Sequence, residues 1–189
     1  MIMKQGLWFV VGCLLVSACT GYSPKPAGYY RIDLPAPGYH EQEFQSGEFQ
    51  ISNQASIVYT SNQEEGEFFN IVYPQLHAQI YCSYLSIKKE NLAQLSEESR
   101  KFVYLHAVKA DAIREQVFDN QEQSVYGIRY NIQGNVASPT QFVLTDSIYS
   151  FFRGALYFDN TPNQDSIAPV LDYINNDIQV LIESFRWKK

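Results

Sequence analysis

The strongest constraint on the fold is an apolar pattern near the C-terminus. Apolar residues between positions 167 and 185 recur at steps of three and four, the spacing of one buried face of an α-helix. They are Ile167, Val170, Leu171, Ile174, Ile178, Leu181, Ile182 and Phe185. A helix in water gains little stability from its own backbone, so a stripe of this length must pack against another element. The pattern predicts a closing helix that covers one face of a sheet.

The expected sheet comes from segments in which apolar and polar residues alternate, the period of a β-strand with one buried face. The predicted strands are residues 29–34, 49–51, 57–59, 68–73, 76–87, 125–133, 141–144 and 150–158. Pro74 separates two of these segments, because proline cannot donate a hydrogen bond to a strand ladder. A connection this short predicts that 68–73 and 76–87 pair as an antiparallel hairpin.

A second helix is predicted in the middle of the chain, where the period changes to that of a helix. Its stripe consists of Leu92, Leu95, Phe102, His106, Ala110 and Ile113. Strands, a helix, more strands and a closing helix predict an α+β domain with a mostly antiparallel sheet covered by two main helices. This order is weakly similar to that of PsbP-like α/β/α sandwiches, an analogy of fold that carries no function.

The N-terminal residues predict export and a lipid anchor. Lys4 precedes the apolar run 7–16, which is too short to span a bilayer and is typical of a signal peptide. The run leads into Val16-Ser17-Ala18-Cys19, which resembles the lipobox of bacterial lipoproteins, whose cysteine is acylated and becomes the first mature residue. An ordinary signal peptide with an unrelated cysteine is the alternative. We expect a signal peptide at 1–18, a lipidated tether at 19–28 and one α+β domain at 29–189.

Charge and cysteine content fit an exported protein and argue against one class of partner. The formal net charge is −6, and it becomes −7 when Lys4 leaves with the signal peptide. Because an acidic chain does not attract a polyanion, we expect no nucleic-acid partner. Cys13 would leave with the signal peptide and Cys19 would carry lipid, so Cys82 would have no internal disulfide partner. Its place in an alternating segment favours a buried apolar role over a reactive thiol.

The histidines and short motifs do not indicate an active site. His40, His77 and His106 fall in different segments, without the spacing of two metal ligands on one helix. The sequence contains no nucleophile elbow, phosphate-binding glycine loop or calcium loop. A hydrolase would need a serine or Cys82 within hydrogen-bond reach of a histidine. We therefore expect no catalytic residues, no metal, and no cofactor other than a covalent lipid on Cys19.

Long polar strings carry a resemblance to a known family. They include Pro24 to Pro35, Ser99-Arg100-Lys101, Gly134-Asn135, Ala137-Ser138-Pro139, Leu144-Thr145-Asp146-Ser147 and Arg153-Gly154-Ala155-Leu156-Tyr157-Phe158. These strings resemble the gliding motility lipoprotein GldD family of Bacteroidetes over essentially the whole mature chain. The resemblance implies a lipoprotein needed for gliding and linked to the type IX secretion system. It implies no enzymatic activity, and only the acylated cysteine transfers from the family, to Cys19.

Two functional hypotheses follow from these observations. The leading hypothesis is a non-enzymatic lipoprotein, anchored by lipid in the cell envelope, that supports assembly or stability of the gliding and type IX secretion apparatus. Its partners would be the membrane and protein components of that machinery. Acidic residues do not directly follow Cys19, which favours the periplasmic face, because surface-displayed lipoproteins of Bacteroidetes tend to carry them there. The alternative is a module that binds a lipid or cell-wall fragment between sheet and helix, which a deep apolar pocket would favour.

Polar residues from the same strings are our candidates for contact with a protein partner. Taken singly, each is more typical of a solvated helix face or of a turn. Together, the candidates are Lys25, Arg31, Arg100, Lys101, Asn135, Asp146 and Arg153.

Overall fold

The computed structural model describes residues 33–63, 66–87, 91–106, 110–159 and 164–188, which belong to one compact unit. The predicted signal peptide and tether lie outside these residues, as do Cys19, Lys25 and Arg31. Within the described part of the chain, neither helix combines the length and apolarity that crossing a membrane requires.

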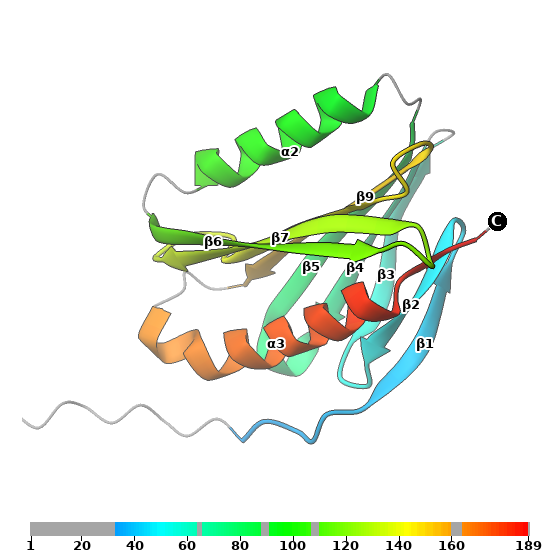
Figure 1. The fold of residues 1–189 in the computed structure, drawn as a ribbon. Helices are drawn as coiled ribbons and strands as arrows, with labels where there is room; N and C mark the ends of the chain where they lie inside the picture. The colour runs from blue at the N-terminus through cyan, green and yellow to red at the C-terminus, as the bar shows by residue number, and fades with distance from the viewer. Residues whose placement is uncertain (1–32, 64–65, 88–90, 107–109, 160–163, 189) are drawn as a thin grey trace, which may run out of the picture. The chain divides into compact units, whose positions relative to one another are not determined.

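A seven-stranded sheet, antiparallel throughout, forms the centre of this unit (Figure 1). In spatial order its strands are β3 (Ser56–Gln63), β4 (Gly66–Tyr73), β5 (Ala78–Ser86), β9 (Ser150–Phe158), β8 (Thr140–Thr145), β7 (Val125–Gly134) and β6 (Ala110–Asn120). The run β3–β5 and the run β6–β9 each follow the chain from neighbour to neighbour. They meet at β5 and β9, where Cys82 pairs with Gly154. The predicted hairpin is confirmed as β4–β5, joined by the 3₁₀ helix η1 (Pro74–Leu76).

The two helices lie on opposite faces of the sheet, with α2 above it and α3 below it in Figure 1. Helix α2 (Leu92–His106) connects β5 to β6, and α3 (Gln164–Ser184) follows β9. The expected α+β fold, a mostly antiparallel sheet packed against helices, is confirmed.

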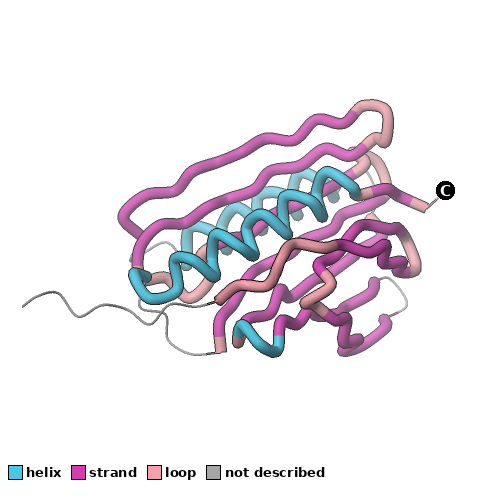
Figure 2. The backbone as a smooth tube through the Cα atoms, turned by 90° about the horizontal axis from the view of Figure 1, so that it is seen from below, coloured by secondary structure: helices cyan, strands magenta, loops and turns pink. Residues whose placement is uncertain are grey.

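A small sheet shares the lower face of the large sheet with α3. It consists of β1 (Tyr39–Phe44), β2 (Gly47–Ser52) and β10 (Arg186–Trp187), in the order β1-β2-β10. Helix α3 contacts β2, and the view from below shows the helix and this sheet side by side (Figure 2). The sequence did not predict β1, because its residues are almost all polar and only Phe44 is buried.

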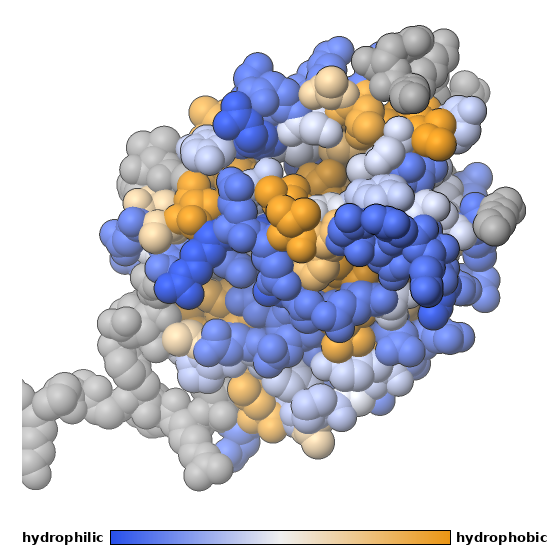
Figure 3. Space-filling model, viewed as in Figure 1, coloured by the Kyte–Doolittle hydropathy of each residue, from blue (hydrophilic) through white to orange (hydrophobic). Residues whose placement is uncertain are grey.

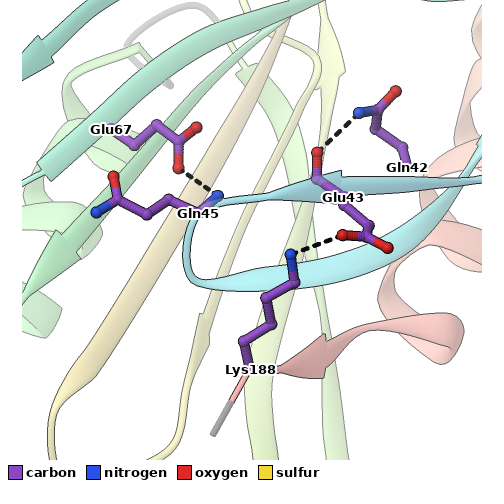
Figure 4. A network of polar contacts seen from close by, with 5 residues as sticks. All are labelled: Gln42, Glu43, Gln45, Glu67 and Lys188. Atoms are coloured by element: carbon purple, nitrogen blue, oxygen red, sulfur yellow. Dashed lines mark hydrogen bonds and ion pairs between the residues drawn. The ribbon is translucent and has the colours of Figure 1, made fainter.

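Polar contacts fasten the end of the chain to the turn between β1 and β2 (Figure 4). The Lys188 ammonium donates to the Glu43 carboxylate over 2.8 Å, and this ion pair lowers the pKa of Glu43. The backbone amide of Lys188 donates to the Ser46 carbonyl over 3.0 Å. On the other side of the turn, the buried Glu67 carboxylate accepts a hydrogen bond from the backbone amide of Gln45 over 2.9 Å. Strand β10 is short, but these side-chain and backbone contacts continue beyond it.

The main core lies between the large sheet and the layer made by α3 and the small sheet. It contains a cluster of phenylalanine rings around Phe152, whose centroid lies 5.2–6.0 Å from those of five neighbours. These neighbours are Phe44, Phe49, Phe69, Phe142 and Phe185. The closing helix supplies the predicted stripe, in which Ile174 and Ile178 are fully buried. Cys82 is also buried here, and burial raises the pKa of its thiol, which confirms the apolar role.

The mid-chain helix is shorter than predicted, and its buried face agrees with the prediction only in part. It ends at His106, while Ala110 and Ile113 belong to β6, which pairs with β7 along its length. The predicted Leu92 and Leu95 pack against a core cluster, but among the described side chains of α2 the buried ones are Ser99 and Val103, and Phe102 is 43% exposed. A step of three places two residues on opposite faces of a regular strand, but the pairing of β6 with β7 shifts register between Ala110 and Ala112, so that Ala110 and Ile113 pack against the same cluster.

The start of the described chain also differs from the prediction. Asp33 and Leu34 are not in a strand, and the rest of the predicted strand 29–34 lies outside the described residues.

Candidate functional site

Three of the predicted contact residues gather around α2. Arg100 and Lys101 are exposed on the helix, and Arg153 reaches up to it from β9. The Arg153 guanidinium carbon lies 4.8 Å from the centre of the Phe102 ring, a cation–π contact. Partial burial lowers the pKa of Arg153. Because the half-buried Arg153 contacts Phe102, it helps to hold α2 on the sheet.

The outer side of α2 carries an ion pair and an aromatic contact. Both Nε and Nη2 of Arg100 donate to the Glu97 carboxylate over 3.0 Å, which lowers the pKa of Glu97. The Arg100 guanidinium also lies 5.5 Å from the centre of the Tyr104 ring. Because solvent screens an exposed pair of this kind, it contributes little to stability, and its main effect is to fix the position of both charges.

Large apolar side chains are exposed beside these charges. Phe102, Tyr104 and Leu105 are 43%, 47% and 68% exposed, and they lie next to Arg100 and Lys101 in the chain. We call these five residues the α2 surface. In the space-filling view, apolar side chains interrupt the hydrophilic surface in the layer above the sheet (Figure 3). Aromatic, leucine and arginine side chains exposed together favour contact with another molecule, because an isolated soluble domain gains nothing from exposing them.

Asn135 and Asp146 lie at opposite ends of the α2 layer. Asn135 is exposed in the loop between β7 and β8, next to Val136, which packs on Val103 of the helix. Asp146 lies in the loop between β8 and β9, near the end where Phe151 packs with Leu92. The structure therefore brings Arg100, Lys101 and Arg153 together around α2, places Asn135 near the end of the helix that carries Val103, and places Asp146 near its opposite end.

Asp146 organises its own loop. Its Oδ1 atom accepts hydrogen bonds from the backbone amides of Ile148, Tyr149 and Ser150, each over 2.8 Å. Thr145 Oγ1 accepts from the Ser147 amide over 3.0 Å and donates to the Ser150 carbonyl over 2.7 Å. Ser147 has a φ of 67°, which these bonds hold in place. The turn role expected for Asp146 taken singly therefore accounts for this side chain.

Replacing Asp146 with alanine removes the acceptor of three backbone amides. We expect the free energy of unfolding to fall by about 0.5–2 kcal/mol, the range found when a side-chain acceptor that caps backbone amides is removed. The Asp146→Asn variant retains an oxygen at the same position and should lose less. Urea titration of both variants measures the difference, and equal losses would show that the acceptor oxygen is not what stabilises the loop.

A hollow of about 150 Å³ lies between α2 and the sheet. Its wall consists of Ser96, Ser99, Tyr126, Gly127, Ile128, Tyr130, Val143 and Thr145. Binding sites for drug-sized ligands usually measure about 300–1,000 Å³, so this hollow holds a small group and not a lipid chain. It does not favour the alternative hypothesis of a lipid-binding module.

The sequence did not lead us to expect a buried carboxylate on the inner face of α3. Asp177 is 3% exposed, and its Oδ1 accepts a hydrogen bond from the Tyr39 hydroxyl over 3.0 Å. Burial raises the pKa of Asp177, and the hydrogen bond from Tyr39 opposes this effect. The signal in the sequence is its position, three residues after Ile174 and four before Leu181, on the buried stripe of the helix.

The raised pKa of Asp177 predicts a dependence of stability on pH. In the unfolded chain its pKa is near the ordinary value of 3.8, so protonation favours the folded state. This contribution is complete below that value and is lost as the pH rises through the folded pKa. We therefore expect wild type to gain stability relative to Asp177→Asn as the pH falls from neutral towards 3.8. Parallel urea titrations across this range measure the difference, and pH profiles with the same slope would contradict the prediction.

The neighbours of His40, His77 and Cys82 in the structure are not those that a hydrolase active site would require. The His40 ring lies 2.9 Å from the Asn53 side chain, and the His77 ring lies 3.8 Å from the Asp159 carboxylate at an exposed site. The His106 side chain is outside the described residues. Cys82 lies in the core, where its sulfur is 3.7 Å from the Ile80 carbonyl oxygen. These environments account for His40, His77 and Cys82 structurally, and they do not favour a role in nucleophilic catalysis.

Comparison with known proteins identifies the family of the chain. The family model of the gliding motility lipoprotein GldD matches residues 19–187, which is nearly the whole chain. A separate comparison with curated proteins finds no match. The match begins at Cys19 and ends at Trp187, and so includes the whole sheet, both helices and the last strand. The chain therefore belongs to the gliding motility lipoprotein GldD family.

Proposed function

We propose that this protein is a non-enzymatic, lipid-anchored subunit that assembles or stabilises a protein complex of the gliding apparatus and the linked type IX secretion system. Its family is one of gliding motility lipoproteins, which implies anchoring to a membrane of the cell envelope. The observation that carries the assembly role is the α2 surface, where three large apolar side chains are exposed beside two cations.

The anchor in this proposal is the N-terminal cysteine of the mature chain. Residues 1–18 are removed, Cys19 is acylated, and residues 19–28 form a short tether before the single domain at 29–189. The start of the family match at Cys19 supports this division. Because no acidic residues directly follow Cys19, we place the domain on the periplasmic side of the membrane.

The composition of the α2 surface supports contact with a protein. Residues that dominate the affinity of protein interfaces are enriched in tyrosine and arginine, surrounded by side chains that exclude water. Tyr104 and Arg100 already contact each other in the free domain, so less conformational freedom is lost when a partner binds. Lys101 adds a positive charge that suits an acidic partner surface.

Affinity purification of the lipidated full-length protein from its own cells after crosslinking tests the proposal. The matched variants are Leu105→Glu on the α2 surface and Val58→Glu, which is 50% exposed on β3, the edge strand at the opposite end of the large sheet from β6. We expect wild type and Val58→Glu to recover gliding or secretion components, and Leu105→Glu and the unlipidated Cys19→Ala to lose them. Loss of motility and secretion should follow the same pattern. If Leu105→Glu recovers the same proteins as wild type, the α2 surface is not the contact; if deletion of the gene leaves motility and secretion intact, the function is wrong.

A further inference from the structure

The loop between β8 and β9 exposes two large apolar side chains. Ile148 is 44% exposed and Tyr149 is 66% exposed. We call these two residues the loop tip. In a turn of this length, polar residues normally occupy the exposed positions, so the tip is an unusual place for an isoleucine and a tyrosine.

The loop tip has a fixed position. Three backbone amides of the loop share the Asp146 carboxylate, and the amide of Ile87, after β5, donates to the Tyr149 carbonyl over 2.7 Å. The loop is thus tied both internally and to a neighbouring segment. These bonds fix the backbone of the loop, and a loop whose backbone is already ordered loses less conformational freedom on binding.

The hollow beneath α2 has the size of the group that the loop tip presents. An apolar cavity of about 150 Å³ accommodates a benzene ring, and this hollow has about that volume. Its floor includes the apolar Ile128 and Val143, and the hydroxyls of Ser96 and Ser99 can bond a phenol group. Thr145 belongs to both features, because it lines the hollow and its hydroxyl organises the loop.

We propose that a second copy of this chain binds here, with Tyr149 of each copy inserted into the hollow of the other. A two-fold symmetric interface requires that a single surface carry both of the groups that meet. The loop tip and the hollow meet this requirement, because they adjoin at Thr145 and have matching size. The inference goes beyond the proposed function and does not depend on it.

The charge distribution supports a second copy as the occupant. The whole chain has a net charge of −6, so two copies repel each other over most of their surface. All eight residues that line the hollow are uncharged, as are Ile148 and Tyr149. At this place, like charges do not oppose the insertion of each Tyr149 ring into the hollow of the other copy.

Sedimentation of the full-length lipidated protein in detergent tests the proposal. Tyr149→Ala removes the ring, and Ser96→Phe fills the hollow from its wall. We expect wild type to sediment as a dimer, and each variant to weaken dimerisation on the order of tenfold or more. Val58→Ala removes an exposed apolar side chain from β3, at the opposite edge of the large sheet from β6, and should remain dimeric. Unchanged melting temperatures would show that the variants fold.

Disulfide trapping is a second measurement, and it detects contact between two different copies of the chain. One tagged copy carries Tyr149→Cys and a differently tagged copy carries Ser96→Cys. We expect oxidation to join the two tags, whereas a pair with Val58→Cys in place of Tyr149→Cys stays separate, because β3 lies at the opposite edge of the large sheet from β6. A wild-type protein that sediments as a monomer, or a Tyr149→Ala variant that remains dimeric, would overturn the proposal. Binding of wild type to phospholipid vesicles that Tyr149→Ala abolishes, without any dimer, would overturn it in favour of a membrane contact.

Discussion

Truncating Phe152 to alanine should lower the free energy of unfolding by about 3–5 kcal/mol, the range for a fully buried phenylalanine. Phe152 is 0% exposed and lies within 6.0 Å, centroid to centroid, of five other phenylalanine rings. These rings come from the large sheet, the small sheet and the residue after α3. Because three parts of the fold meet at this side chain, the cavity cannot close by moving one of them.

Phe102→Ala is the matched control for this prediction. The same residue type is removed from α2, where the ring is 43% exposed and contacts Arg153. The loss there should be about 1 kcal/mol, which corresponds to one cation–π contact and a small buried area. Urea titration at equilibrium measures both variants. Equal losses would mean that the phenylalanine cluster is not the centre of the core.

Adding a single methyl group at Gly154 should also destabilise the protein, by about 1–3 kcal/mol, because the core around it is already filled. A Cβ atom at this position would lie 2.3 Å from Cζ and 2.4 Å from Cε1 of Phe142. Phe142 is 0% exposed, so its ring has no free space into which it can move. We therefore expect Gly154→Ala to have a clearly lower urea midpoint than wild type.

A double variant tests whether the contact with Phe142, and not a general loss of strand stability, causes the effect of Gly154→Ala. The Phe142→Leu substitution removes the atoms that would clash, and it leaves an apolar side chain in place. In the double variant, the loss from Gly154→Ala should be smaller than in the wild-type background, a coupling between neighbours that additive effects would not give. Additive losses would show that the close contact with Phe142 is not the reason for the glycine.

The sequence predicts best those elements that are buried along a continuous face. The strand 150–158 matches β9, and the stripe from Ile167 to Phe185 matches α3 with the following residue, because burial against the core selects apolar residues at most inward positions. It predicts least well the elements at the margins. Strand β6 lies at the edge of the sheet and is polar enough that Ala110 and Ile113 fitted a helical period equally well.

The candidate site depends on information that a linear pattern does not contain. Arg153 lies under Phe102 because β9 is inserted beside β5, and this strand order follows from the packing of the whole domain. The Asp177 carboxylate and the Tyr39 hydroxyl meet across 138 positions of sequence. Sequence analysis did select Arg100, Lys101 and Arg153, which the structure brings near one helix, but their role in binding stays a prediction.

The pairing of distant strands also determines when the protein can fold. Strand β5 cannot pair with β9 until α2 and three further strands have been made, and β10 completes the small sheet only with Arg186 and Trp187. A ribosome delivers the chain from its N-terminus, so these long-range contacts form last, and folding with such contacts is slow. The incomplete chain therefore cannot close its core early. It reaches its native state only after Arg186 and Trp187 have been made.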